Sequence, residues 1–178
     1  MDFITGLDGN ILLWIQENLR MDAWDPVVVF ITRLGNGGAI WIIASVCMLF
    51  FPRSRKMGLL VLSALLASLI VNNWILKNLA ARSRPWVDVE GLKILISKPT
   101  DYSFPSGHTA SSFAAAVVVC KNVQKEYRWL GAAALALAFG IGLSRLYIGV
   151  HYPTDVLFGA LSGTLIAQML CYFVKRKR

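Results

Sequence analysis

Long apolar blocks alternate along the sequence with short stretches that carry most of the charges. A helix needs roughly 20 apolar residues to cross the hydrocarbon core of a bilayer, and the blocks at 57–80, 129–149 and 155–174 reach that length. Two further blocks, 37–51 and 106–120, are shorter. The block at 106–120 is rich in Ala and Ser, which lets helices pack closely in a membrane bundle. The pattern predicts an all-α fold, a polytopic membrane helix bundle of five to six transmembrane helices.

The N-terminal segment has a different pattern. Ile11, Leu12, Ile15 and Leu19 recur at helical spacing with polar side chains between them. This spacing predicts that residues 10–20 form an amphipathic helix that lies in the membrane interface rather than crossing the bilayer.

A second short helix is predicted at 25–34, with Pro26 in its first turn, and the sequence GNGG at 35–38 predicts a break after it. A sixth span made from residues 1–34 is the alternative. It would bring four charged side chains between positions 17 and 25 into the bilayer, which is costly.

Composition agrees with a membrane protein, since 56% of the residues are hydrophobic and 16% are charged. We expect a single domain over 1–178, with 1–35 at the interface, 36–174 as the transmembrane bundle and 175–178 as a basic tail. The net charge of +8 would indicate nucleic-acid binding if the cations formed a stripe on a soluble surface. Here the cations lie between apolar blocks, so no nucleic-acid partner is expected.

The distribution of charges predicts the orientation. Segments 52–56, 121–128 and 175–178 carry ten Lys and Arg against one acid, whereas the rest of the chain carries eight Lys and Arg and nine acids. Loops rich in Lys and Arg stay in the cytoplasm. We therefore expect a multi-pass protein of the plasma or inner cell membrane with a cytoplasmic C-terminus, and with the loop 81–105 and the turn 150–154 on the extracytoplasmic face.

Three polar clusters fall at the predicted outer ends of the spans. In the first, KNLAARSRP at 77–85, a helix that continued past Leu79 would bring Lys77 and Arg84 onto one face, because they are two turns apart. Taken alone, a lysine that snorkels and an arginine that binds headgroups explain this cluster more simply.

The second cluster is PSGH at 105–108. Ser106 can cap a helix, Gly107 lets a ligand approach the backbone, and His108 falls in the first helical turn. The free N–H groups and the dipole of such a helix end attract anions. An ordinary serine cap beside an interfacial histidine is the alternative.

The third cluster, SRLYIGVHYPTD at 144–155, contains Arg145, His151 and Asp155. The spacing of four residues lets Asp155 accept a hydrogen bond from one nitrogen of His151, which leaves the other nitrogen free and basic. A capping aspartate beside an unrelated histidine is the alternative.

Together the three clusters favour a single phosphate site. Lys and Arg neutralise the charge of a phosphate, and Arg can do so bidentately. One histidine can attack phosphorus while the other protonates the leaving oxygen. The two histidines of the chain both lie in these clusters, which makes three separate coincidences the poorer explanation.

The pattern resembles the signature of the type 2 phosphatidic acid phosphatase (PAP2) superfamily, which reads Lys-x6-Arg-Pro, Pro-Ser-Gly-His and Ser-Arg-x5-His-x3-Asp. All three motifs are complete and in order, as Lys77, Arg84 and Pro85, then Pro105, Ser106, Gly107 and His108, then Ser144, Arg145, His151 and Asp155. The resemblance covers about residues 57–170 and does not determine the first 35. It implies a small membrane lipid phosphatase of the bacterial type.

The resemblance also implies a role for each site residue. His151 would be the nucleophile that forms a phosphohistidine, Asp155 would orient it, and His108 would be the general acid and then the base for water. The phosphate would be held by Lys77, Arg84, Ser106, the Gly107 N–H and Arg145. The family needs no metal, and no set of Cys, His and carboxylates in this sequence has ligand spacing. Neither a metal nor another cofactor is therefore expected.

A site at the outer headgroup level implies a substrate that stays in the bilayer. A lipid phosphate monoester or diphosphate fits, and the resemblance favours undecaprenyl diphosphate, with phosphatidate and phosphatidylglycerophosphate as alternatives. The rival from another class is a non-catalytic phospholipid-binding or transport bundle that keeps a phosphate pocket. The two histidines with Asp155 favour the enzyme. The sequence does not predict the oligomeric state.

Specificity is expected to lie in the loop 86–102 and the N-terminal helices, which the motifs do not constrain. Asp88, Glu90 and Asp101 in this loop are expected to be solvated. The alternative is that they repel anionic headgroups.

Overall fold

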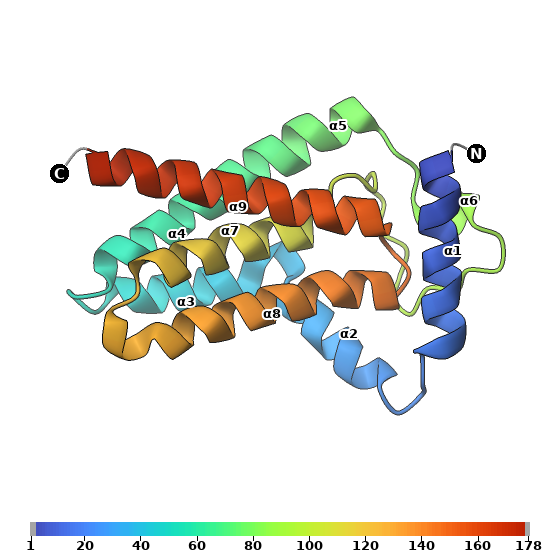
Figure 1. The fold of residues 1–178 in the computed structure, drawn as a ribbon, viewed down its shortest axis with the longest axis horizontal. Coiled ribbons are helices and arrows are strands. Elements are labelled where there is room, and N and C mark those ends of the chain that lie inside the picture. Colours follow the sequence, from blue (N-terminus) through green and yellow to red (C-terminus); the bar gives the residue numbers. More distant parts are fainter. Residues whose placement is uncertain (1–2, 177–178) are drawn as a thin grey trace.

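The computed structural model describes residues 3–176, which form a bundle of helices with one further helix across its end (Figure 1). No strand occurs among these residues, so the predicted all-α fold is confirmed. The elements are α1 Phe3–Asn18, α2 Asp25–Leu34, η1 Asn36–Gly38, α3 Ala39–Leu49, α4 Arg55–Ser68, η2 Leu69–Leu76, α5 Lys77–Ala80, α6 Pro85–Asp88, α7 Gly107–Asn122, η3 Lys125–Tyr127, α8 Arg128–Tyr147 and α9 Pro153–Arg176.

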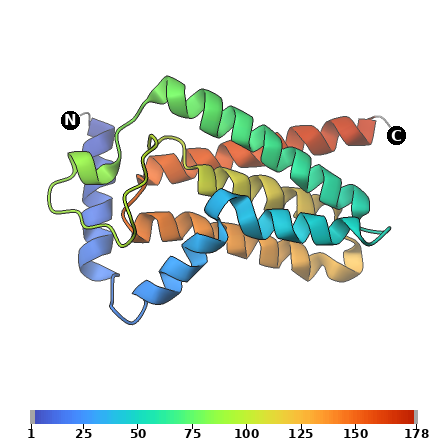
Figure 2. The same ribbon diagram turned by 180° about the vertical axis from the view of Figure 1, so that it is seen from behind.

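One end of the bundle brings together chain segments that are far apart in the sequence. At this end α5 and α8 finish and α7 and α9 begin, and α1 lies across it (Figure 1). The long connection between α6 and α7 passes over the same end beside α1 (Figure 2). All three polar clusters therefore meet at one end, while the C-terminal end of α9 lies at the other.

Helix α7 occupies the centre and packs against α4, α8 and α9. Ala110 and Ala114 on α7 are fully buried. Gly159 and Gly163 of α9 lie against it, and a Cβ on Gly163 would come within 2.2 Å of the Ala110 carbonyl oxygen. Small residues on both helices thus permit the close approach that the Ala/Ser-rich block predicts.

Three of the described helical stretches are long and apolar enough to cross a membrane, namely Arg55–Asp88, Lys125–Tyr147 and Pro153–Arg176. The pair Asp25–Leu34 and Asn36–Leu49, bent by 47°, makes a fourth if it forms one broken span. Helix α7, with 16 residues, is shorter than these. The span count of five to six therefore stays a prediction.

Helix α1 coincides with the predicted amphipathic helix but begins earlier, at Phe3. Leu12 and Ile15 are buried against the bundle, whereas Ile11 and Leu19 are exposed. The apolar stripe is thus only partly used for packing, and the exposed apolar side chains remain available to lipid at the end of the bundle.

The predicted break after α2 lies at Gly37 and Gly38, whose φ angles are 58° and 73°. Glycine adopts this left-handed region without the steric cost that a Cβ would bring. Pro26 lies in the first turn of α2 as predicted.

The helix does not continue far enough past Leu79 to carry both Lys77 and Arg84 on one face. The helix that begins at Arg55 passes through a π-helical stretch, ends at Ala80, and Ala81 takes a left-handed conformation with φ 44°. Arg84 lies beyond this turn in extended backbone directly before Pro85. The two cations share a site because the chain folds back, not because of helical phase.

Candidate active site

A cavity of about 640 Å³ opens between η1, α4, α7 and the loop before α7. Six of the predicted site residues line it: Lys77, Arg84, Gly107, His108, Arg145 and His151. The other two, Ser106 and Asp155, are fully buried next to residues that line it, since Ser106 precedes Gly107 and Asp155 contacts His151. The structure therefore brings all eight to one place.

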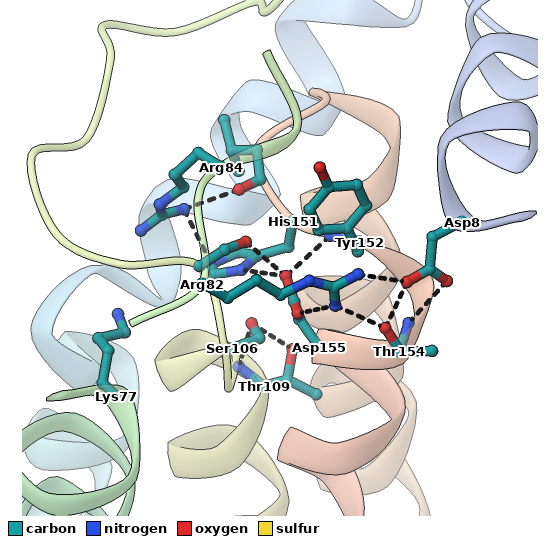
Figure 3. A network of polar contacts seen from close by, with 12 residues as sticks. Asp8, Lys77, Arg82, Arg84, Ser106, Thr109, His151, Tyr152, Thr154 and Asp155 are labelled. Atoms are coloured by element: carbon teal, nitrogen blue, oxygen red, sulfur yellow. Dashed lines mark hydrogen bonds and ion pairs between the residues drawn. The ribbon is translucent and has the colours of Figure 1, made fainter. Parts of the chain in front are cut away.

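His151 lies in the turn between α8 and α9 and is 1% exposed. Its Nδ1 is 3.4 Å from Asp155 Oδ2 (Figure 3), and its Nε2 is 3.2 Å from Arg84 Nη1. A guanidinium can only donate hydrogen bonds, so the contact with Arg84 requires an unprotonated Nε2. The imidazole proton therefore lies on Nδ1, which faces Asp155. Burial, followed by the charges of Arg84 and Arg145, lowers the pKa of His151 well below its usual value. The imidazole is thus neutral, and the lone pair of its Nε2 faces the Arg84 guanidinium.

Asp155 is held from several directions because it begins α9 just after His151. Its Oδ2 accepts hydrogen bonds from Ser103 Oγ at 2.5 Å and from the Tyr152 N–H at 2.9 Å. Its Oδ1 accepts one from Arg82 Nη1 at 2.7 Å (Figure 3). A buried carboxylate with these partners has a fixed orientation toward the imidazole.

Lys77 and Arg84 converge on Asp101 from the loop. Lys77 Nζ forms an ion pair with Asp101 Oδ2, and Arg84 Nη2 lies 2.5 Å from Asp101 Oδ1. Arg84 also donates to the Asp101 and Val150 carbonyl oxygens. Both cations are almost fully buried. Because Asp101 pairs with both, its carboxylate occupies the position between them where an anionic ligand would be expected.

Asp101 is half exposed, as expected of a loop acid, but it also forms two ion pairs that were not predicted. Burial alone would raise the pKa of Asp101, but hydrogen bonds and charge from Lys77 and Arg84 lower it to about 2. Asp88 also has partners, since it accepts hydrogen bonds from Tyr152 and Ser83, whereas Glu90 is exposed as expected. The sequence gives no indication of these contacts, because an acid in an irregular loop has no spacing that relates it to its partners.

Ser106 caps α7, and its Oγ accepts a long hydrogen bond of 3.5 Å from the Thr109 N–H. The Ser106 N–H donates to the Asp155 carbonyl oxygen at 3.1 Å, which ties the start of α7 to the start of α9. Gly107 faces Asn73, and a Cβ there would lie 2.8 Å from the Asn73 amide oxygen. Gly107 is therefore needed for packing against a polar residue that lines the cavity.

His108 lies in the first turn of α7 and lines the same cavity as Lys77 and Arg84. Its Nε2 is 2.9 Å from Asn36 Oδ1, in the bend between α2 and α3. A Cβ on Gly35 would lie 2.9 Å from the imidazole. The sequence predicted the break at this point, but not that the break would hold a histidine.

Arg145 is 2% exposed near the end of α8. Its Nη1 donates to Thr32 Oγ1 of α2 at 2.7 Å, and its Nε has no hydrogen-bond partner among the described residues. A buried guanidinium with an unused donor beside a cavity favours binding of an anion there.

Two charged residues near the site were missed at the sequence level. Arg82 was read only as part of the connection between Lys77 and Arg84, and Asp8 was not singled out. Both lie within the part-buried hydrogen-bond network of Figure 3. Neither has a spacing that would reveal it, because its partners come from distant segments.

Among residues 3–176, no three His, Cys, Asp or Glu side chains gather as metal ligands. The donors around the cavity are instead mostly cations and N–H groups, which suit a phosphate rather than a metal ion. That the reaction proceeds without a metal remains a prediction.

The sequence model of the PAP2 superfamily matches residues 57–178. An undecaprenyl-diphosphatase from Sulfolobus acidocaldarius is 36% identical over 142 residues, which are 79% of this chain and 66% of that protein. The chain thus spans just under two thirds of that relative's length.

Two solved structures share the fold over almost the whole chain. A PAP2-type phosphatidylglycerolphosphate phosphatase from Bacillus subtilis superposes with a TM-score of 0.83 at 26% identity, covering 100% of this chain and 89% of that one. LpxE from Aquifex aeolicus superposes with a TM-score of 0.80 at 26% identity, covering 93% and 95%.

Proposed function

Since this chain belongs to the PAP2 superfamily, we propose that it is an integral-membrane lipid phosphatase that works through a phosphohistidine at His151. The observation that carries the proposal is the geometry at His151, whose Nε2 faces Arg84 while its Nδ1 faces Asp155. An uncharged imidazole beside a buried cation cluster suits nucleophilic attack on a bound phosphate.

In the first step, His151 Nε2 forms a bond to phosphorus while the bond from phosphorus to the lipid oxygen breaks. His108 donates a proton to that oxygen. Lys77, Arg84, Arg145, Ser106 and the Gly107 N–H hold the phosphoryl oxygens and stabilise their charge in the transition state.

In the second step, a water oxygen bonds to phosphorus and the phosphorus–nitrogen bond to His151 breaks. His108 takes the proton of the water, and inorganic phosphate leaves. Asp155 holds the imidazole in one tautomer through both steps.

The apolar part of the cavity wall supports a lipid as substrate. Leu65 and Leu66 of α4, Leu69 of η2 and Ile42 of α3 line it, and Leu66, Leu69 and Ile42 are 57%, 41% and 42% exposed. An acyl or prenyl chain can therefore lie along the outside of the bundle while its phosphate enters the cavity.

Undecaprenyl diphosphate is the proposed substrate, because a relative at 36% identity bears the name undecaprenyl-diphosphatase. Phosphatidylglycerophosphate, supported by the Bacillus subtilis structure, and phosphatidate are the alternatives. A phosphate-release panel in detergent, with these three lipids, a water-soluble phosphate ester and added EDTA, tests the proposal. Release from at least one lipid in EDTA is expected. Release from none would favour a non-catalytic phospholipid-binding bundle.

We further propose that the site faces the extracytoplasmic side of the cell membrane and that the C-terminus is cytoplasmic. The support is that basic segments 52–56 and 121–128 lie at the end of the bundle away from α1 (Figure 1). After Cys47, Cys120 and Cys171 are replaced, an impermeant thiol reagent should label Glu90→Cys but not Arg53→Cys in intact cells. The reverse labelling would invert the topology.

A further inference from the structure

A chain of polar contacts leads from the N-terminal helix to the His151 imidazole (Figure 3). It begins at Asp8 of α1, which is only 3% exposed. Asp8 Oδ2 accepts a hydrogen bond from Arg82 Nη2 at 2.9 Å and another from Thr154 Oγ1, and Asp8 Oδ1 accepts the Thr154 N–H at 3.3 Å. A buried acid on an interfacial helix thus contacts both the connection after α5 and the start of α9.

Arg82 is the central link of this chain. Its Nη1 donates to Asp155 Oδ1 and to Thr154 Oγ1, each at 2.7 Å, while its Nη2 reaches Asp8. Its guanidinium carbon lies 3.9 Å from the centre of the Tyr152 ring, a cation–π contact that holds the plane in place. The planar fork of an arginine is what allows one side chain to bridge two carboxylates.

The two oxygens of Asp155 are used differently. Oδ2 accepts hydrogen bonds from Ser103 Oγ, the Tyr152 N–H and His151 Nδ1. Among the described contacts, Oδ1 accepts its hydrogen bond from Arg82. Arg82 therefore controls the rotation of the carboxylate and balances a charge that is fully buried. Asp8 in turn fixes Arg82.

We infer that Arg82 and Asp8 are positioning residues, which act through Asp155 to hold the His151 imidazole for attack; this inference rests on the proposed function. Neither lines the cavity that would bind the phosphate. Their loss is expected to lower kcat while KM changes little, because they support the nucleophile and not the phosphate.

Gln16 offers a matched control on the same helix. Its Nε2 donates to the Gly91 carbonyl oxygen at 3.1 Å, and its Oε1 accepts the Lys93 N–H at 2.7 Å. These contacts dock α1 to the loop after α6 but reach no residue of the network. Gln16→Ala therefore weakens the docking of α1 and leaves the network intact.

The test compares the full-length wild type with Asp8→Asn, Arg82→Gln, Arg82→Lys, the double variant and Gln16→Ala, using phosphate release in detergent. We expect Asp8→Asn to lower kcat about tenfold and Arg82→Gln about 100-fold, with KM within about twofold. Arg82→Lys keeps the charge but cannot bridge both carboxylates, so it should recover only part of the loss. The double variant should be no worse than Arg82→Gln, since both act on one path.

Gln16→Ala should keep the kcat of the wild type even if it lowers Tm. Wild-type kcat in Asp8→Asn, or equal losses of kcat in Asp8→Asn and Gln16→Ala, would overturn the inference. Losses that appear only in KM would overturn it as well.

A second measurement separates this inference from the proposed function. The Nδ1 proton of His151, hydrogen-bonded to a carboxylate, should give a downfield NMR signal, which a His108→Asn background isolates because the chain has two histidines. The signal should weaken or move in Asp8→Asn and Arg82→Gln but not in Gln16→Ala. An unchanged signal would contradict the inference even if the wild type released no phosphate, whereas an inactive wild type with a shifted signal would count against the proposed function alone.

Discussion

The two halves of the site differ in how far contacts within the protein preorganise them. The nucleophile corner, made of His151, Asp155 and Ser103, is almost fully buried and each polar group has its partner within the protein. The phosphate corner, made of Lys77, Arg84 and Asp101, depends on an acid that is 50% exposed and comes from a loop. On the proposed function, the first corner is ready before a substrate arrives, whereas in the second a phosphate would take the place of a carboxylate.

The largest effect is expected from removing the nucleophile. His151→Ala should reduce phosphate release by more than about 10³-fold, since in the proposed mechanism His151 alone forms the phosphorus–nitrogen bond and His108 serves as the acid. Phosphate-release assays check this, with circular dichroism and Tm showing that the variant is folded. Substantial residual turnover by a folded variant would remove His151 as the nucleophile.

Arg145 tests whether charge alone is enough at the phosphate corner. Arg145→Lys keeps a cation but loses the unused Nε donor and the bond to Thr32, so kcat/KM should fall about 100-fold. The control is Arg33→Lys, at an exposed position near the end of α2, which should behave as wild type. Equal activity of both variants would mean that Arg145 has only a structural role.

The same contrast explains what the sequence could predict. His151 and Asp155 are four residues apart in one turn, so their spacing indicates their contact. Asp101 meets Lys77 and Arg84 through the path of an irregular loop, and Arg82 meets Asp8 across 74 positions. Local spacing predicts contacts within one element, but pairings between distant segments depend on how the whole bundle folds.

The helices show the same division. The apolar blocks predicted the long helices, since periodicity and length are local properties. The end of α5 at Ala80 matches the end of the predicted block at 57–80, whereas the left-handed turn at Ala81 was not predicted, because alanine does not usually adopt this conformation. Tertiary contacts of Arg84 with Asp101 and Val150 accompany that turn and are not visible in the sequence.

Asp101→Asn tests whether this acid competes with the phosphate. Without its negative charge, Lys77 and Arg84 are free to bind an anion, so inorganic phosphate should inhibit the variant at about tenfold lower concentration than the wild type. Glu90→Gln, an exposed acid of the same loop, serves as the control and should leave inhibition unchanged. Weaker inhibition of Asp101→Asn would show that Asp101 builds the anion site instead of competing for it.

The smallest effect is the contribution of Asp101 to stability in acid. Its pKa lies at about 2, below the usual 3.8, so folding favours the ionised form. The stability gained from the ion pairs is present above pH 3.8 and is lost as the pH falls through about 2. The difference in Tm between the wild type and Asp101→Asn should therefore shrink over this interval.

Because Asp101 is half exposed, solvent and salt screen its ion pairs, and the Tm difference should also decrease in 1 M salt. Glu90→Gln forms the baseline, since Glu90 has no ion pair among the described residues, and its Tm should follow that of the wild type throughout. A Tm difference between the wild type and Asp101→Asn that stayed constant from pH 5 to pH 2 would mean that Asp101 acts through packing of the loop. The phosphate corner would then be held by packing of the loop and not by a charge that a phosphate can replace.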